Sequence, residues 1–218
     1  MTCTKQKTKT EVLAIAIPLF ANGGYDGVTM RQIAAAVGIK AASLYYHFPD
    51  KQTLYIDALG FAFAERIKPL SEAFTLAAEP QERLRMLLDK FCILMAEDVD
   101  FARLIEREIM HGDATRLQFL ADHVFTEFVR DMMDLGRALA PHRDPHLLAI
   151  SVVALVVYHF QITPLRSFLP GFKKSHNDPG VVARHIFSLL ESGLFARPAS
   201  LGNRDVIRDR NSSDYLAR

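Results

Sequence analysis

The sequence predicts an all-α protein. Apolar residues recur at helical spacing along most of the 218 residues, and no stretch alternates between apolar and polar residues as a half-buried strand would. Half of the residues are hydrophobic, which is ample for a large buried core. We expect about nine helices: a small N-terminal domain of three helices, followed by a larger helical domain.

The first helix is expected from about residue 7 to residue 22. Its apolar face would be formed by Leu13, Ala16, Ile17 and Phe20. Gly23 and Gly24 end the pattern. Pro18 lies inside this helix and predicts a kink, because proline removes one backbone hydrogen bond.

Two short helices follow, joined by a turn at Gly38. The first has an apolar face formed by Met30, Ile33, Ala34 and Val37, and the second has one formed by Ala41, Leu44, Tyr45 and Phe48. Thr29 is placed to cap the first helix, and Gly38 suits the left-handed conformation that often follows a helix. This arrangement predicts a helix-turn-helix, whose second helix presents small, hydroxylic and aromatic side chains to a DNA groove.

The same stretch resembles the N-terminal domain of TetR/AcrR-type transcriptional regulators. The resemblance runs from about residue 7 to residue 59, about a quarter of the chain. It is carried by Leu19-Phe20, Gly24-Tyr25, Thr29-Met30, Ile33-Ala34, Gly38, Leu44-Tyr45, His47-Phe48 and Lys51. In this family the second helix of the motif lies in the major groove of double-stranded operator DNA.

The resemblance implies a set of DNA-contacting residues. They are Thr29, Arg31, Lys40, Ala42, Ser43, Tyr45, Tyr46, His47 and Lys51. Arg31 has a planar guanidinium that suits a guanine edge or a phosphate, and Lys51 resembles the family's phosphate-binding lysine. Ala41 and Ala42 replace larger polar groups of many relatives and offer only methyl groups, so base readout would rest on Arg31 and on the hydroxyl groups of the second helix.

The charge distribution agrees with a nucleic-acid partner at the N-terminal end. The whole chain has 26 basic and 25 acidic residues, whereas residues 1–55 have six basic and three acidic ones. A positive excess at the end that carries the helix-turn-helix is what phosphate binding requires.

We expect a cytoplasmic protein. Cys3 and Cys92 are too few for a disulfide framework and have no metal-ligand spacing. Lysines followed by an apolar run near residue 10 imitate a signal peptide, but Glu11 interrupts the pattern and the run has helical amphipathic spacing. The longest apolar run, residues 147–158, is shorter than the roughly 20 residues of a membrane span, so no membrane association is expected.

The later helices form the predicted second domain. Pro49 ends the third helix, Asp50 caps a fourth helix starting near Lys51, and Pro69 is expected to bend or break it. Further helices are predicted at about 80–97, 99–111, 115–140, 145–169 and 179–196. The predicted domains are residues 1–55 for DNA binding and 56–197 for effector binding and dimerisation, with a disordered tail at 198–218.

The second domain is rich in aromatic residues. Thirteen of the 15 phenylalanines follow Phe48. In the resembling family some such residues line a ligand cavity, which implies a small apolar or amphipathic effector. We expect Phe91, Phe101, Phe128 and Tyr158 to line this pocket.

The resemblance also implies a homodimer, in which the last two long helices pair with their twofold mates in a four-helix bundle. Two apolar stripes suit this role. They are Leu148, Ser151, Val152 and Leu155 on one helix, and Val182, His185, Ile186, Leu189 and Gly193 on the other. The alternative is that these stripes fill the core of one chain.

The overall prediction is a homodimeric repressor that an effector releases from a palindromic operator, with no cofactor, no metal and no enzymatic activity. One alternative is a DNA-binding regulator that has no ligand. Another is a helical metal-dependent enzyme, since Glu108-x-x-His111 matches half of a di-iron motif and His142 and His146 are four residues apart. Neither pattern is specific, because no second Glu-x-x-His pair exists in the sequence.

Overall fold

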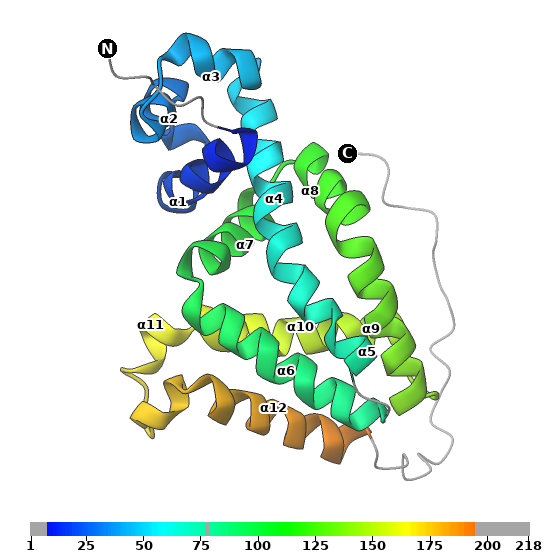
Figure 1. Cartoon of the computed structure of the whole chain (residues 1–218). Helices are drawn as coiled ribbons and strands as arrows, with labels where there is room; N and C mark the ends of the chain where they lie inside the picture. Colours follow the sequence, from blue (N-terminus) through cyan, green and yellow to red (C-terminus); the bar gives the residue numbers. More distant parts are fainter. Residues whose placement is uncertain (1–7, 77–78, 195–218) are drawn as a thin grey trace, which may run out of the picture.

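The computed structural model describes residues 8–76 and 79–194. Its regular secondary structure in these ranges is helical throughout. Helices α1 (Lys9–Gly27), α2 (Met30–Val37) and α3 (Ala41–His47) form a small bundle at one end of the molecule. Helix α4 (Lys51–Ser71) leaves this bundle and runs into the larger helical body (Figure 1). The predicted all-α fold with an N-terminal helix-turn-helix is confirmed.

The larger body contains the remaining helices. They are α5 (Ala73–Leu76), α6 (Pro80–Glu97), α7 (Val99–His111), α8 (Ala114–Leu120), the π-helical turn η1 (Ala121–Phe125), α9 (Thr126–Leu139), α10 (Pro145–Gln161), α11 (Thr163–Arg166), the 3₁₀ turn η2 (Lys174–Asn177) and α12 (Pro179–Leu194). Helix α12 packs along α6, and α10 packs against α9. Helix α7 contacts α1, so it links the body to the N-terminal bundle.

Two of the predicted helices, 80–97 and 99–111, coincide with α6 and α7. The predicted helix 115–140 is divided by the π-helical turn, and the predicted helix 145–169 stops at Gln161. Pro164 follows this stop, and it has no N–H to continue the helical hydrogen bonds. These interruptions and two single-turn helices raise the number of α-helical segments in the described residues to twelve, against the nine expected. The last two residues of the predicted helix 179–196 and the predicted disordered tail lie outside the described residues.

Local capping explains where the N-terminal helices start and stop. The hydroxyl of Thr29 accepts the N–H of Gln32 at 3.3 Å, while the Gln32 side chain accepts the N–H of Thr29 at 2.8 Å. Gly38 ends α2 with a left-handed φ of 78°, as predicted. Within α1 the residue with non-helical angles is Gly24, at φ 69°, so the helix breaks at the predicted glycines and a short turn continues to Gly27.

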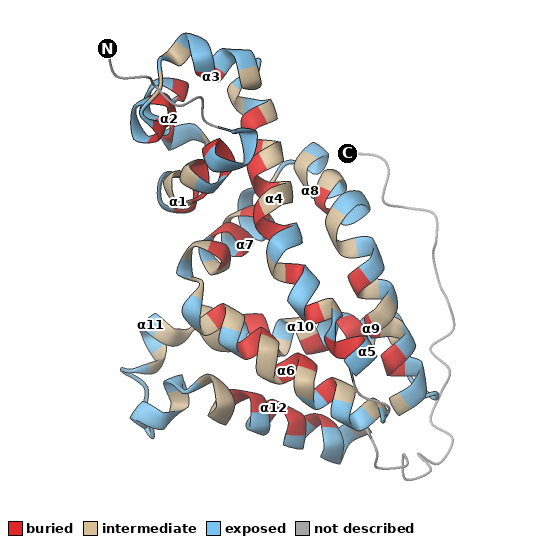
Figure 2. Cartoon of the chain, in the orientation of Figure 1, coloured by how far each residue is buried: buried red, intermediate tan, exposed pale blue. Residues whose placement is uncertain are grey.

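One continuous apolar core extends from the N-terminal bundle to α12. Figure 2 shows buried residues on the inner sides of α1, α2 and α4 and again on α6 and α12. Helix α4 is continuous across residue 55, so the proposed division into domains at that point cuts a helix that both parts share. In the described part of the chain, no helix is both long and apolar enough to cross a membrane.

Candidate nucleic-acid interface

The buried apolar side chains of α2 and α3 hold the helix-turn-helix against the rest of the N-terminal bundle. Ile33 and Ala34 of α2 and Leu44 of α3 are buried, and Phe48 closes the end of α3 in the same core. Because these side chains point inward, the opposite face of α3 points away from the protein. The local spacing of apolar residues therefore sets which side of α3 is presented to a partner.

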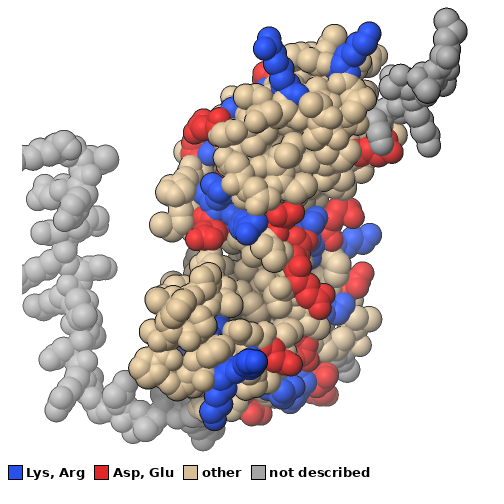
Figure 3. All heavy atoms as spheres, turned by 90° about the vertical axis from the view of Figure 1, so that its left-hand side faces the viewer, with Lys and Arg blue, Asp and Glu red and all other residues tan. Residues whose placement is uncertain are grey.

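The predicted DNA-contacting residues come from the start of α2, from α3 and the residue before it, and from the start of α4, and most of them are exposed. Exposed are Thr29, Arg31, Lys40, Ala42, Ser43, Tyr45 and Tyr46, whereas His47 and Lys51 are half-buried. Tyr46 is 82% exposed and Tyr45 is 51% exposed, so Tyr45 belongs less to the core than its spacing suggested. Figure 3 shows Lys and Arg side chains projecting from the end of the molecule where α2 and α3 lie.

Lys51 has a partner within the protein. Its ammonium donates to the backbone carbonyl of Tyr25 at 2.9 Å and lies 4.2 Å from the centre of the Tyr25 ring. This contact ties the start of α4 to the end of α1. One of the three ammonium hydrogens is used in this way.

A buried ionic network lies behind the interface, where α4 meets α7 and α8. The Glu108 side chain is buried; its Oε1 accepts the Tyr55 hydroxyl at 2.6 Å and its Oε2 accepts Arg116 Nε at 3.0 Å. Burial, and then the Glu108 hydrogen bond, raise the pKa of Tyr55, so the phenol keeps its proton and remains a donor. Arg116 also pairs with Asp113 at 2.6 Å.

Two arginines of α7 hold the C-terminal end of α1. Arg107 donates from Nε to the carbonyl of Ala21 at 3.0 Å and from Nη2 to the carbonyl of Asn22 at 2.9 Å. Arg103 donates to the side-chain oxygen of Asn22. Cations are favourable here because the end of a helix carries partial negative charge. Gly24 permits the close approach, since a Cβ there would lie 3.0 Å from Arg107 Nη1.

Sequence reasoning missed this junction. The only signal in the sequence is the four-residue spacing of Arg103 and Arg107 on one face of α7, and nothing in it shows that Ala21 and Asn22 are their partners. Glu108 was considered as half of a metal motif, but both of its oxygens are engaged by Tyr55 and Arg116. Among residues 8–76 and 79–194, no group of three or more His, Cys, Asp or Glu side chains is arranged to hold a metal ion.

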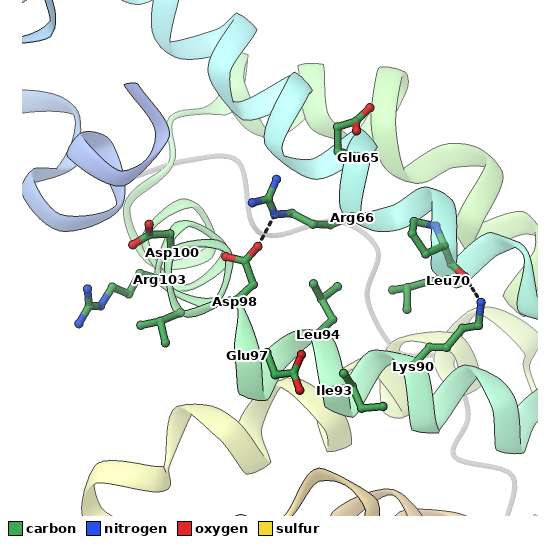
Figure 4. Close-up of a pocket in the computed structure, with 12 residues that line it drawn as sticks. Glu65, Arg66, Leu70, Lys90, Ile93, Leu94, Glu97, Asp98, Asp100 and Arg103 are labelled. Carbon is green, nitrogen blue, oxygen red and sulfur yellow. Dashed lines mark hydrogen bonds and ion pairs between the residues drawn. The ribbon is translucent and has the colours of Figure 1, made fainter. Parts of the chain in front are cut away.

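The predicted pocket residues are not among those that line the cavity between α4, α6 and α7. Phe91, Phe101 and Phe128 are buried in the core, and Tyr158 is 62% exposed on α10. A cavity of about 700 Å³ does lie between α4, α6 and α7 (Figure 4). It is lined by Glu65, Arg66, Pro69, Leu70, Lys90, Ile93, Leu94, Glu97, Asp98, Val99, Asp100 and Arg103.

The predicted dimer stripes are partly on the surface. Exposed are Ser151, His185, Leu189 and Gly193, and half-buried are Leu148 and Leu155. The assignment of Val152, Val182 and Ile186 to a surface is wrong, because these side chains are buried in the core of the chain. Helices α10 and α12 both have apolar residues on the side facing the core and on the side facing solvent. The spacing of apolar residues alone therefore did not distinguish the buried side from the exposed side.

The outer side of these helices contains exposed apolar residues that the prediction omitted. On α10 they are Leu147, Ile150 and Tyr158. A groove of about 500 Å³ runs between α10 and α12, with Leu147 and Leu189 among its lining residues. We name the exposed residues Leu147, Ile150, Ser151, Tyr158, His185, Leu189 and Gly193 the α10/α12 face.

The exposed tyrosines of α3, the exposed cations Arg31 and Lys40 near it and the supporting bundle are the features of a helix-turn-helix DNA-binding domain. Residues 12–58 match the sequence profile of bacterial regulatory proteins of the tetR family. This part of the chain therefore matches the N-terminal DNA-binding domain of TetR-type transcriptional regulators.

Individual relatives agree with this assignment. The chain is 46% identical over 55 residues to IcaR, the negative transcriptional regulator of the biofilm operon icaADBC in Staphylococcus aureus (strain Newman); the match covers 25% of this chain and 30% of IcaR. It is 25% identical over 155 residues to the transcriptional activator FasR of Mycolicibacterium smegmatis (strain ATCC 700084 / mc(2)155), covering 70% of each protein. The fold matches that of AibR in complex with isovaleryl coenzyme A and operator DNA, with a TM-score of 0.65 and 21% identity over 83% of this chain and 96% of AibR.

Proposed function

We propose that the protein is a homodimeric repressor that binds a palindromic operator and is released from it by a small-molecule effector. The observation that supports this most directly is the exposed face of α2 and α3, with Arg31, Ser43 and Tyr46 pointing away from a well-packed core. The negative regulator IcaR, which is similar over this part of the chain, favours repression over activation. Such a protein would act in the cytoplasm, where bacterial operators lie.

In this proposal α3 enters the major groove. Arg31 would donate to a guanine or a phosphate, and Ser43 and Tyr46 would contact base edges or backbone. Lys40 stands at the start of α3, exposed and close to where a phosphate would pass. Two such helices in a twofold dimer would read half-sites about 34–36 Å apart, which is one turn of DNA.

The test is a fluorescence anisotropy titration of the full chain against DNA flanking its own gene, at several salt concentrations. The Arg31→Ala, Tyr46→Ala double variant should bind a palindromic segment roughly a hundredfold more weakly, because a good base contact contributes about 1–3 kcal/mol. Arg130→Ala is the matched control, since Arg130 is exposed on α9, away from α3. Equal affinity for the operator and random DNA, unchanged in the double variant, would contradict operator binding by this face.

The dimer is proposed to form through the α10/α12 face. This face exposes large apolar side chains on both sides of a groove, and burying them against a second copy would remove that apolar area from water. The Leu147→Glu, Leu189→Glu double variant should sediment as a monomer and lose most of its operator affinity, while Leu117→Glu on α8 should not. A double variant that stays dimeric would rule out this face.

Effector release is proposed to act through α4 and α7. The Arg107 contacts to α1 and the Tyr55–Glu108–Arg116 network fix the N-terminal bundle against the body. An effector that favours a different position of α4 would shift the population towards a dimer whose recognition helices no longer match the half-sites. The alternative, a regulator without a ligand, predicts that no small molecule raises the thermal unfolding midpoint and weakens operator binding.

A further inference from the structure

The segment that joins α10 to α12 exposes apolar side chains at one end of the body. We name residues 162–177, which include α11 and η2, the arm. Phe168 is 83% exposed, and Leu165 and Leu169 are 55% and 45% exposed. The N–H of Phe168 bonds to the carbonyl of Leu165 at 3.0 Å, so the chain turns here and the three side chains share one side of the arm. Clustered exposed apolar residues, unlike scattered ones, mark interaction surfaces.

Contacts inside the arm hold these side chains in place. Arg166 donates from Nη1 to the carbonyl of His176, which joins the first and last turns of the arm. The rings of Phe172 and His176 lie 6.0 Å apart at an angle of 81°, and Gly171 takes a left-handed φ of 82° at the bend between the two turns. Phe168 therefore lies on a surface that is already formed, and little loss of conformational entropy opposes its docking.

A complementary groove lies at the opposite end of the same two helices. It is the groove of about 500 Å³ between α10 and α12, which is lined by the first turns of α10 and the last turns of α12. Leu148 and Leu190 line it, and Leu147 and Leu189 are exposed beside them. Among the described residues no atom lies within 4 Å of the position that a Cβ on Gly193 would take. The groove therefore has room for an aromatic ring.

The arm cannot reach the groove of its own chain. Helix α10 has 17 residues and is about 25 Å long at 1.5 Å per residue, with the groove at its first turns and the arm after its last residue. Figure 1 shows α11 at the left-hand end of α10, and α12 begins at that same end. A twofold axis through the middle of the α10/α12 face would reverse the direction of a second copy. The arm of each copy would then lie on the groove of the other.

Charge favours the same pairing. The sequence has no Asp or Glu from residue 145 to residue 177, and the basic side chains of the arm are Arg166, Lys173 and Lys174. At the groove end Asp144 and Glu191 are exposed, and the guanidinium of Arg143 is bonded to the carbonyl of Gly193 at 2.9 Å. A basic arm is attracted to exposed carboxylates, whereas an arm placed against a second arm would bring like charges together.

We propose that the arm of each subunit docks in the groove between α10 and α12 of its partner. Phe168 would insert between Leu147 and Leu189, with Lys173 and Lys174 beside the exposed carboxylates. The occupant of the groove is thus a second copy of this chain in an antiparallel arrangement. This docking rests on the proposed function, since it requires the proposed dimer, and it adds the contact that sets how the two copies are aligned. Because the two contacts are related by symmetry, one substitution removes both.

The first test measures dimer dissociation by sedimentation velocity on a dilution series of the full-length chain. Phe168→Ser removes both inserted rings and should raise the dissociation constant at least about a hundredfold, because burial of an aromatic side chain contributes strongly to association. Met110→Ser is the matched control, since Met110 is 67% exposed on α7, outside the arm and the groove, and it should dimerise like the parent. An unchanged dissociation constant in Phe168→Ser overturns the proposal.

The second test identifies the surfaces that meet, by disulfide formation in a Cys3→Ser background. Phe168→Cys combined with Leu147→Cys should give a covalent dimer on oxidation, whereas each single cysteine variant should remain largely uncrosslinked. A disulfide needs Cα atoms within about 7 Å, so the two positions cannot be linked within one chain. Efficient crosslinking of Phe168→Cys alone would mean that arm meets arm. A double variant that is dimeric but not crosslinked would mean that another face forms the dimer. Either result overturns the docking.

A titration with operator DNA separates the docking from the proposed function. Operator binding by a dimer whose arm and groove do not crosslink overturns the docking and leaves the repressor standing, and crosslinking without operator binding does the reverse. With both intact, Phe168→Ser should lose operator affinity at low protein concentration and regain it at high concentration, because the arm acts on assembly and not on α3. If Phe168→Ser leaves the dimer unchanged but abolishes cosedimentation with phosphatidylglycerol vesicles, the arm is a membrane-binding surface and the docking is overturned.

Discussion

The hydroxyl of Tyr55 is the smallest group whose removal tests the junction between α4, α7 and α8. Tyr55→Phe deletes one oxygen and leaves Glu108 Oε1 buried without its donor, while Arg116 still pairs with Oε2. A hydrogen bond to a charged group contributes about 1.5–3 kcal/mol. For a chain of this length each kcal/mol lowers the melting temperature by about 2–4 °C, so we expect a decrease of roughly 3–12 °C.

Glu108→Gln should destabilise the protein more. It removes the charge that Arg116 faces, and breaking a buried pair costs about 3–5 kcal/mol. The cost should lie near the lower end of that range, because Arg116 keeps its contact with Asp113. In the double variant the two losses should overlap by about 1–2 kcal/mol, since both mutations affect the hydrogen bond from the Tyr55 hydroxyl to the charged Glu108 side chain.

The assay is urea and thermal unfolding of the parent, both single variants and the double variant, at one fixed protein concentration. Tyr46→Phe is the control for unfolding, since its ring is 82% exposed and the loss of its hydroxyl should cost less than about 0.5 kcal/mol. If Tyr55→Phe costs no more than Tyr46→Phe, the network does not stabilise the junction. The parent and the Tyr55 and Glu108 variants should also be titrated with operator, because loosening the junction should weaken DNA binding.

The direction of the pH dependence follows from the raised pKa of Tyr55. The neutral phenol is favoured in the fold, so its contribution to stability is complete below the ordinary value of 10.0 and decreases as the pH rises from there towards the folded-state pKa. The parent should therefore lose stability above pH 10 more steeply than Tyr55→Phe. Parallel curves would contradict this explanation.

Three further predictions concern single residues. Thr29→Ala should cost about 1 kcal/mol in urea unfolding through the lost cap of α2 and should weaken operator binding. Gly24→Ala should lower the free energy of unfolding by about 1–3 kcal/mol, because φ 69° with ψ 177° is a conformation that only glycine adopts easily. The new Cβ would also lie 3.0 Å from Arg107 Nη1. An unchanged free energy of unfolding would mean that this turn relaxes easily. In a Cys3→Ser background Cys92 should resist a thiol reagent at pH 8, because burial raises the pKa of its thiol to about 12; rapid labelling of the folded protein would show that α6 opens.

Features encoded within a few residues were predictable from the sequence. Thr29 as a cap, Gly38 as a left-handed stop and the spacing from Met30 to Phe48 together define α2, the turn and α3. The boundaries of α6 and α7 were equally clear, because Pro80 starts one helix and Asp98 caps the next. In each case the determining side chains lie within one turn of the backbone that they shape.

Features that depend on distant residues were not predictable in the same way. The Arg107 contact to Ala21 joins residues 86 positions apart, and no local pattern reports it. Helices α10 and α12 have apolar residues on both sides, so the buried Val152 and the exposed Leu147 look alike in a helical repeat. The cavity depends on how α4, α6 and α7 are placed, so no local pattern predicts its lining, and Phe91 and Phe101 are not among the residues that line it.

The length of α4 has a geometric consequence for a regulator of this kind. Its 21 residues span about 31 Å, and one end begins directly after α3 while the other passes the cavity at Pro69 and Leu70. A tilt of only about 6° about the cavity end would carry the other end sideways by about 3 Å, close to the 3.4 Å rise of one base step. Helix α4 would therefore amplify a small movement at the cavity. A displacement there smaller than the length of a hydrogen bond would shift α3 along the DNA by about one base pair.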